Sequence, residues 1–129
     1  MPKRANPTDA GADLFSPTKC TVYPDGNQFI DLGFQIEIPE GYAGFIYARS
    51  GLGSKVGIYP RNCVGVIDSK YRGNVGIMLH NDSVDWFYVN IGDRIAQMVI
   101  APIATPTFKL SDTLDETDDR NGGFGSTGI

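Results

Sequence analysis

The amino-acid sequence predicts an all-β protein built as a sandwich or a barrel. Short runs of alternating apolar and polar residues recur at intervals of roughly 8–12 residues, which is typical of sandwiches and barrels. Turn signals separate these runs, and 16 glycines and 8 prolines among the 129 residues supply many of them. No long stretch carries the apolar stripe of an amphipathic helix. These observations favour short strands packed into one β domain.

The clearest predicted strand spans residues 31–38, where an apolar residue occupies every second position from Leu32 to Ile38. A period of two is typical of a strand with one buried face. A single helical turn is predicted around residues 50–55. The same alternation, bounded by clusters of Pro, Gly, Asn and Asp, predicts the other strands, in chain order, at residues 20–23, 45–48, 63–67, 75–79, 87–91, 95–100 and 107–110.

The length of the chain suits one domain, which we expect at residues 1–110. Residues 111–129 differ in composition and are predicted to form an acidic linker and a mobile, Gly-rich arm. Such a composition is also typical of a disordered terminus. However, Phe124 is a stacking group among small residues whose backbone N–H groups can close on an anion. This pattern favours an arm that closes over a ligand.

The net charge of -4 conceals an uneven distribution of charge. Five of the 15 acidic residues lie close together near the C-terminus: Asp112, Asp115, Glu116, Asp118 and Asp119. The rest of the chain has ten acidic residues and 11 Lys and Arg residues, so its charge is close to neutral. The acidic isoelectric point therefore reflects the tail and does not argue against an anionic ligand.

Composition also narrows the classes of function. No apolar run approaches the roughly 18 residues that span a membrane, and no apolar stretch follows the first residues as in a secretory signal. We therefore expect a cytoplasmic protein that binds neither membranes nor nucleic acid. Cys20 and Cys63 are predicted to be buried thiols, because disulfides are rare in that compartment. With one histidine and two cysteines, the composition argues against a dedicated zinc site. The histidine, His80, is predicted to be an ordinary residue of a sheet face, and nothing near it in the sequence supports a Ser-His-Asp triad.

Five short motifs carry the chemical information. In chain order they are Ala-Gly-Ala-Asp-Leu at 10–14, Ala-Arg-Ser-Gly-Leu-Gly at 48–53, Asn-Cys-Val-Gly-Val-Ile-Asp-Ser-Lys-Tyr-Arg-Gly at 62–73, Gly-Asp-Arg-Ile-Ala-Gln-Met at 92–98, and Arg-Asn-Gly-Gly-Phe-Gly-Ser-Thr-Gly at 120–128. This series closely resembles the trimeric dUTP pyrophosphatases (dUTPases), from about Pro2 to the last residue. The resemblance implies a distorted jelly-roll or β-barrel-like fold and a homotrimer with shared active sites. It also implies hydrolysis of dUTP to dUMP and pyrophosphate with Mg²⁺, which lowers dUTP and supplies dUMP for thymidylate synthesis.

Asp68 is the candidate catalytic residue. It follows an apolar run, where a carboxylate can orient a water molecule and accept its proton, although an Asp before a turn commonly only caps that turn. The resemblance implies that Asp68 is the general base that activates water to attack the α-phosphorus. It also implies that Tyr71, otherwise an ordinary aromatic residue of a strand face, packs against the deoxyribose and leaves no space for a 2′-hydroxyl group.

The phosphate contacts are expected on two other motifs. Arg49, Ser50 and Gly51 offer guanidinium, hydroxyl and backbone N–H donors on a tight turn, which suits phosphate oxygens. From the residues alone, such a segment is more often an ordinary turn with one surface arginine. The resemblance implies that these residues bind the α- and β-phosphates with help from Gln97. It further implies that Asp93 holds an arginine of this group.

The resemblance assigns the remaining contacts. Asn62, with hairpin backbone that includes Gly65, reads the uracil edge, and cytosine would leave its donors unpaired. From the arm, Phe124 stacks on uracil, while small residues and one arginine hold the γ-phosphate: Arg120, Gly125, Ser126 and Thr127. Magnesium is expected on the substrate phosphates, with no direct protein ligand and with Asp13 reached through water.

The chain departs from the family pattern at both ends. It begins at the segment that matches Leu-Pro-x-Arg, so we expect one edge strand of the usual sheet to be absent. The arm has one residue fewer between its arginine and the Gly-Gly-Phe segment, and this difference affects the γ-phosphate contact expected for Arg120.

Two other functions stay open. One is a dCTP deaminase of the same fold, which would need a glutamate base where this chain has Met78. The other is a nucleotide-sensing module without turnover.

Overall fold

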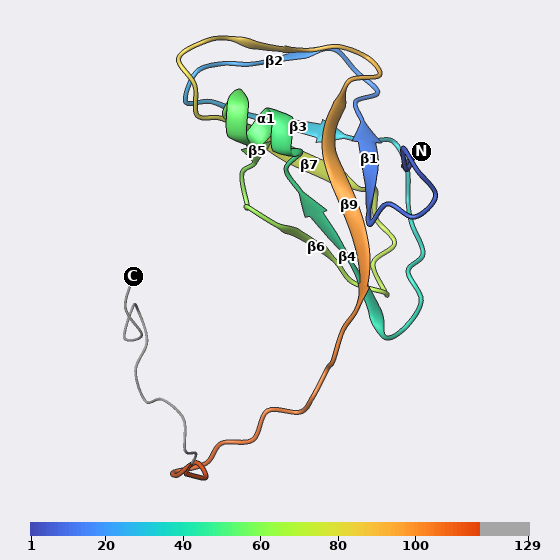
Figure 1. The fold of residues 1–129 in the computed structure, drawn as a ribbon, viewed down its shortest axis with the longest axis vertical. Coiled ribbons are helices and arrows are strands. Elements are labelled where there is room, and N and C mark those ends of the chain that lie inside the picture. The colour runs from blue at the N-terminus through green and yellow to red at the C-terminus, as the bar shows by residue number, and fades with distance from the viewer. Residues whose placement is uncertain (117–129) are drawn as a thin grey trace.

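The computed structural model describes residues 1–116, and its nearly all-β architecture confirms the predicted fold class (Figure 1). The described part contains nine strands and one short helix. They are β1 (Gly11–Phe15), β2 (Cys20–Val22), β3 (Asn27–Asp31), β4 (Tyr42–Tyr47), α1 (Ser50–Lys55), β5 (Ile58–Pro60), β6 (Gly65–Ile67), β7 (Gly76–Asn81), β8 (Phe87–Val89) and β9 (Arg94–Pro102). The expected helical turn therefore has the predicted bounds.

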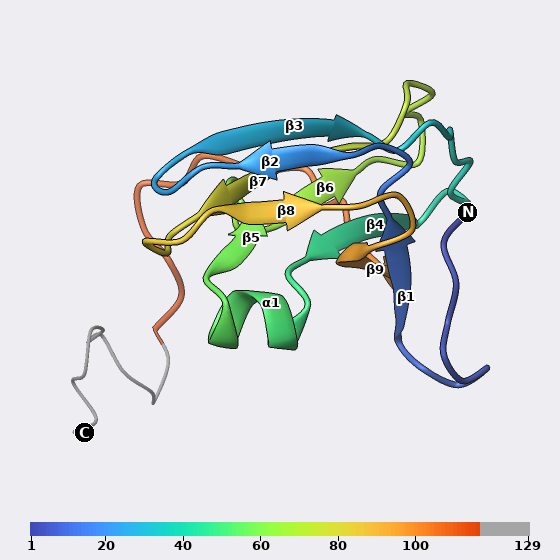
Figure 2. The ribbon, with the colours of Figure 1, turned by 90° about the horizontal axis from the view of Figure 1, so that it is seen from above.

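The strands form three antiparallel sheets. The largest has the order β1-β9-β4-β6, and the others have the orders β3-β7-β5 and β2-β8. Figure 1 shows β9 running between β1 and β4. From above, β2 and β3 lie along one side of the molecule and α1 on the opposite side (Figure 2). At the outer edge of β1, backbone hydrogen bonds join Lys3 and Asp13 in both directions.

One apolar core joins the three sheets. Each of seven strands contributes a side chain that is at most 2% exposed: Leu14, Val22, Ile30, Ile58, Leu79, Val89 and Ile95. Burial of each such side chain stabilises the fold by about 1.5–3 kcal/mol relative to exposure. The largest sheet is thereby fixed against the other two, and its loops are held at defined places.

Residues 32–38 are a correction to the predicted secondary structure. Their alternation is present, since Leu32 and Ile38 are buried while Gln35 and Glu37 are exposed, but the segment is not a strand. Two backbone hydrogen bonds join it to Val75, from Leu32 N to the Val75 carbonyl and from Val75 N to Phe34. Alternation reports which face is buried, whereas a strand also needs a partner backbone along its length.

The predicted strand at residues 107–110 is also wrong. Phe108 and Leu110 are 97% and 95% exposed, and the chain after β9 runs away from the sheets (Figure 1). Within the described residues no neighbouring strand lies beside this segment. The sequence prediction also missed β1, β3 and β5, which are short and lack a long alternating run.

The cysteine and histidine predictions are confirmed in part. Cys20 and Cys63 are free thiols, as expected, but Cys63 is exposed because it occupies the tip of a hairpin with φ of 63°. Burial raises the pKa of the Cys20 thiol. His80 lies on β7 and is 7% exposed, with Nδ1 3.0 Å from Oδ1 of Asn27. In the part of the chain that the structure describes, no helix is long and apolar enough to cross a membrane.

Candidate active site

A polar cluster forms where β1, β4 and β9 meet. Arg49 Nε donates to Asp13 Oδ1 at 2.8 Å, and Arg94 Nη1 lies 3.5 Å from Asp13 Oδ2. Gln97 is the register partner of Asp13 on one side and of Tyr47 on the other. Its Nε2 donates to the Ala48 carbonyl at 2.9 Å, which ties β9 to the residue before Arg49. We call Asp13, Arg49, Arg94 and Gln97 the arginine cluster.

Burial makes Asp13 the anchor of this cluster. Its side chain is 17% exposed, against 27% for Arg49 and 52% for Arg94. Arg49 bonds Asp13 through Nε, and among residues 1–116 its guanidinium has no other side-chain partner. The terminal NH₂ groups of Arg49 are therefore available to an anion, which the planar guanidinium can bind in bidentate fashion.

The structure corrects the expected role of Asp93. Asn90 N donates to Asp93 Oδ2 at 2.8 Å, so this carboxylate closes the turn before β9 rather than holding an arginine. Asp13 holds both arginines instead. The sequence reasoning missed Arg94, although its place in the Gly-Asp-Arg motif was a usable signal.

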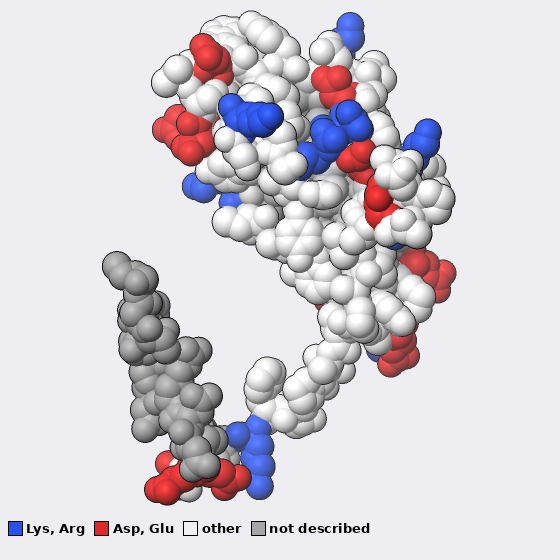
Figure 3. Space-filling view, in the orientation of Figure 1, with Lys and Arg blue, Asp and Glu red and all other residues white. Residues whose placement is uncertain are grey.

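Ser50 and Gly51 begin α1 directly after Arg49. Arg49 is the extended N-cap residue, with φ of -79° and ψ of 136°, and its carbonyl accepts the backbone N–H of Gly53 at 2.8 Å. A side chain at Gly51 would meet no atom within 4 Å, so the space beside the first turn is open. Figure 3 shows basic and acidic side chains interleaved over the face that carries α1, β1 and β9, with further acidic side chains at the end of the described tail.

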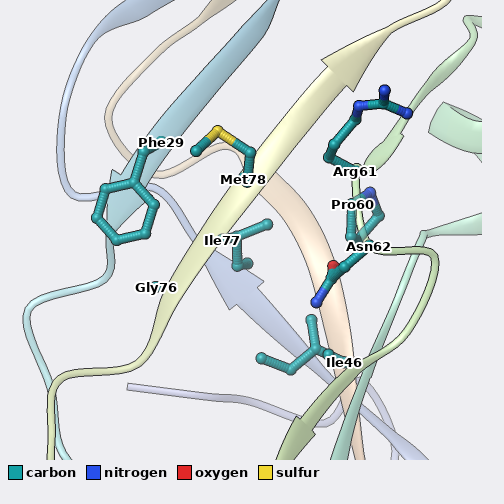
Figure 4. Close-up of a pocket in the computed structure, with 9 residues that line it drawn as sticks. Phe29, Ile46, Pro60, Arg61, Asn62, Gly76, Ile77 and Met78 are labelled. Carbon is teal, nitrogen blue, oxygen red and sulfur yellow. The ribbon is translucent and has the colours of Figure 1, made fainter.

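A pocket of about 560 Å³ lies beside the β5–β6 hairpin (Figure 4). Its lining is apolar except near the hairpin: Phe29, Ile46, Pro60, Arg61, Asn62, Gly65, Gly76, Ile77 and Met78. In Figure 4 the Asn62 side chain points toward Ile46 and Ile77, and Arg61 points away. A Cβ atom at Gly65 would lie 3.6 Å from Asn62 Nδ2, so the two predicted uracil-binding residues share this pocket.

Asp68 and Tyr71 lie in the turn that follows β6. Both side chains are exposed, and Tyr71 N donates to the Asp68 carbonyl at 3.0 Å. Tyr71 Oη donates to the Asn74 carbonyl at 2.8 Å, which folds the ring back over Gly73. The carboxylate of Asp68 is thus presented to solvent at the end of a short strand, where it is accessible to a water molecule and a substrate.

Within one chain, Asp68 and the arginine cluster lie at opposite ends of β4. Ile67 pairs with Gly44 and Gly65 with Ile46, so the chain leaves β6 toward the start of β4. Arg49 follows the end of β4. At about 3.3 Å per residue, this register separates Asp68 from Arg49 by roughly 20 Å. The structure therefore brings Arg49 and Gln97 together, and Asn62 and Gly65 together, but does not unite Asp68 with Arg49.

No group of three or more His, Cys, Asp or Glu residues that could hold a metal ion occurs in residues 1–116. The predicted contacts of the arm fall outside the described residues: Arg120, Phe124, Gly125, Ser126 and Thr127.

Comparison with known proteins gives consistent matches over the whole chain. The family model described as dUTPase matches residues 1–128. A protein of Desulfitobacterium hafniense named deoxyuridine 5′-triphosphate nucleotidohydrolase is 46% identical over 132 residues, which cover 100% of this chain and 87% of that protein. A protein of Yarrowia lipolytica with the same name is 44% identical over 130 residues, which cover 99% of this chain and 82% of its relative.

Solved structures agree with these matches. A variant of the Staphylococcus bacteriophage 80alpha dUTPase with dUpNHpp has a TM-score of 0.92 and 32% identity, covering 100% of this chain and 92% of that one. A variant dUTPase from phage phi11 of S. aureus, described as coordinating a structural Mg(II) ion, has a TM-score of 0.82 and 31% identity, covering 90% and 92%.

Proposed function

The chain belongs to the dUTPase family, and on this premise we propose that it hydrolyses dUTP to dUMP and pyrophosphate. The observation that supports the proposal is the position of β6, which connects the hairpin pocket to Asp68. Its first residue, Gly65, lines the hairpin pocket, and Asp68 follows its last residue. A nucleotide whose base enters the pocket would extend toward this carboxylate.

Asp68 is the proposed general base. Its exposed carboxylate accepts a proton from water as the water oxygen attacks the α-phosphorus in line with the departing pyrophosphate. Tyr71 packs against the deoxyribose in this proposal and excludes a 2′-hydroxyl group. The folded-back position of its ring, bonded to the Asn74 carbonyl at 2.8 Å, supports a fixed wall rather than a mobile side chain.

Uracil recognition is proposed for the hairpin pocket. The Asn62 amide supplies one donor and one acceptor beside apolar walls, so a pyrimidine edge with the wrong donor pattern leaves buried polar groups unpaired. The α- and β-phosphates are proposed to bind Arg49, Ser50, Gly51 and Gln97. Phe124 would stack on the base, while the other contacts of the arm would bind the γ-phosphate: Arg120, Gly125, Ser126 and Thr127.

Magnesium fits this site as an ion held mainly by the substrate. Both carboxylate oxygens of Asp13 are engaged by arginines, so direct coordination would break the ion pairs that position Arg49. The donor set suits an ion carried by the phosphates, with water between it and Asp13. When bound, Mg²⁺ would neutralise charge on the triphosphate.

We further propose that the active site is shared between chains of a homotrimer. The separation of roughly 20 Å between Asp68 and Arg49 prevents one chain from placing both on the same phosphate. The exposed apolar residues after β9 also support an assembly in which they are covered, since Phe108, Leu110 and Leu114 are all at least 88% exposed. A cytoplasmic location, a role in supplying dUMP for thymidylate synthesis, and the absence of nucleic-acid and membrane partners stay predictions.

A deaminase function is disfavoured by the side chain at position 78. Met78 lines the pocket from β7, and its thioether cannot transfer a proton as a glutamate base would. A sensor without turnover keeps the same binding residues, so only a rate measurement separates it from an enzyme.

One assay tests these functions together. The protein is incubated with Mg²⁺ and dUTP, dCTP or dTTP, and pyrophosphate and ammonia are quantified. We expect pyrophosphate from dUTP alone. Ammonia from dCTP would indicate the deaminase, and binding of dUTP without any product would indicate the sensor.

A further inference from the structure

The side chain of Tyr71 depends on residues 73 and 74 for its position. Its hydroxyl group donates to the Asn74 carbonyl at 2.8 Å, and its ring covers Gly73 so closely that a Cβ atom there would lie 2.7 Å from Cζ. Tyr71 is 42% exposed, so packing alone does not fix its side chain. A displacement of Asn74 would therefore displace the surface that Tyr71 presents.

Asn74 is in turn held by a residue far away in the sequence. Its Nδ2 donates to Asp31 Oδ2 at 3.0 Å, and Asp31 Oδ1 accepts the backbone N–H of Gly33 at 2.8 Å. The hydrogen bond from Asn74, followed by that from Gly33, lowers the pKa of Asp31. The side chain is therefore a carboxylate at neutral pH, and its bond to Asn74 is charge-assisted.

Asp31 is the last residue of β3, and backbone hydrogen bonds continue past it only as far as Val75, the residue after Asn74. Asp31 pairs with Gly76 in the β3–β7 ladder, and Leu32 N donates to the Val75 carbonyl at 2.9 Å. Asn74 is the next residue outward, where the chain turns toward Tyr71. The carboxylate of Asp31 thus holds Asn74, the first residue beyond the backbone hydrogen bonds of the sheet. The carbonyl group of Asn74 is the one that accepts the hydrogen bond from the Tyr71 hydroxyl group.

We propose that Asp31 is a positioning residue for Tyr71, acting through Asn74, and that it sharpens the discrimination of dUTP from UTP. This inference rests on the proposed function, in which Tyr71 packs against the deoxyribose. Without the carboxylate, Asn74 and the Tyr71 ring gain freedom, and space opens for a 2′-hydroxyl group. Asp31 touches no substrate in this proposal, so its effect is on geometry.

A second contact between the same two segments provides a matched control. Arg72 Nη2 lies 3.4 Å from Glu37 Oε1, and both side chains are mostly exposed, so this ion pair contributes little to the stability of the fold. Arg72 also donates to the carbonyl groups of Ser69 and Tyr71, which hold it without Glu37. Glu37→Ala therefore removes an acidic contact to this turn without releasing Asn74.

The experiment measures kcat and KM for dUTP and UTP in the wild type, Asp31→Ala, Asn74→Ala, the double variant and Glu37→Ala. We expect Asp31→Ala to lower the dUTP-to-UTP ratio of kcat/KM by about three- to tenfold, as for loss of one hydrogen bond. KM for dUTP should rise more than kcat falls.

Asn74→Ala should have the same effect, and the double variant should match either single variant, because Asp31 acts through Asn74. Glu37→Ala should retain the wild-type ratio.

Three outcomes would overturn the inference. An unchanged ratio in Asp31→Ala, with normal dUTP turnover, would overturn it while leaving the proposed function intact. Additive effects in the double variant would show that Asp31 does not act through Asn74. A wild-type protein that releases no pyrophosphate from dUTP would overturn the proposed function and this inference with it. Because Asp31 is exposed, its substitution leaves the core unchanged, and thermal unfolding of each variant checks this.

Discussion

Asp13 shows how one partly buried carboxylate organises a group of cations. It bonds Arg49 at 2.8 Å and lies 3.5 Å from Arg94, so two guanidinium groups from distant segments are held near each other against their mutual repulsion. Each arginine uses only some of its N–H donors to contact Asp13. The remaining N–H groups give this end of the sheet the capacity to bind an anion although the chain carries a net charge of -4.

At the residue scale, Asp68→Asn is expected to lower kcat for dUTP by about 10²–10⁴-fold, the usual contribution of a general base. The amide cannot accept the proton of water, yet it keeps the shape of the side chain. Binding of a non-hydrolysable dUTP analogue, measured by calorimetry, should change little.

Asp25→Asn is the matched control for this substitution. Asp25 lies in the turn after β2 with φ of 52°, a conformation that Asn tolerates well. It should keep the wild-type rate. A rate for Asp68→Asn within a fewfold of the wild type would show that another group accepts the proton.

At the scale of elements, the segment 32–38 covers the largest sheet without joining it. Ile38 Cδ1 would lie 2.9 Å from a Cβ atom at Gly44, which shows that this side chain rests directly on the backbone of β4. The alternation of residues 32–38 predicted the buried face correctly. It could not predict the missing ladder, because pairing depends on which backbone lies alongside, and that partner is set by the rest of the chain.

Gly44→Ala is expected to lower the free energy of unfolding by about 1–3 kcal/mol through overpacking. The added methyl group would press on Ile38, Ile100 and Ile67, all within 3.4 Å of its position. Urea unfolding monitored by circular dichroism measures the change.

Gly51→Ala provides the comparison, because its methyl group meets no atom within 4 Å. Alanine is also the better helix former, so the stability of this variant should equal or exceed that of the wild type. Equal stabilities of Gly44→Ala and the wild type would mean that Ile38 can move aside without cost.

At the scale of the whole molecule, the register of the largest sheet divides the proposed active site. Asp68 follows β6 near the start of β4, while Arg49 follows the end of β4. A shared site in a closed trimer would reunite the two groups from different chains. Cyclic assemblies with identical interfaces are common, and each interface would then contain one complete site.

Mixing two inactive variants tests this arrangement. Asp68→Asn and Arg49→Gln should each be nearly inactive alone. When the two are refolded together at equal amounts, about a quarter of the sites in random trimers should combine an intact Asp68 with an intact Arg49 from a neighbour. We expect recovery of about a quarter of the wild-type rate, measured as pyrophosphate release.

Two controls accompany the mixing experiment. Each variant refolded alone should stay inactive, and the variants mixed without unfolding should recover only as fast as chains exchange. No recovery in mixed trimers, verified with differently tagged chains, would place both residues in one chain's site and contradict the shared arrangement.

The fold class, the helical turn at Ser50–Lys55 and the motifs of the family could be predicted from the amino-acid sequence, because these depend on local periodicity and on residue types at short spacing. Three other features could be learned only from the folded chain: Asp13, rather than Asp93, holds Arg49; residues 32–38 stay outside the sheets; and Asp31 accepts a hydrogen bond from Asn74. Each of these depends on contacts between segments tens of residues apart. Strand register sets such contacts, and a register is selected by the packing of the whole core.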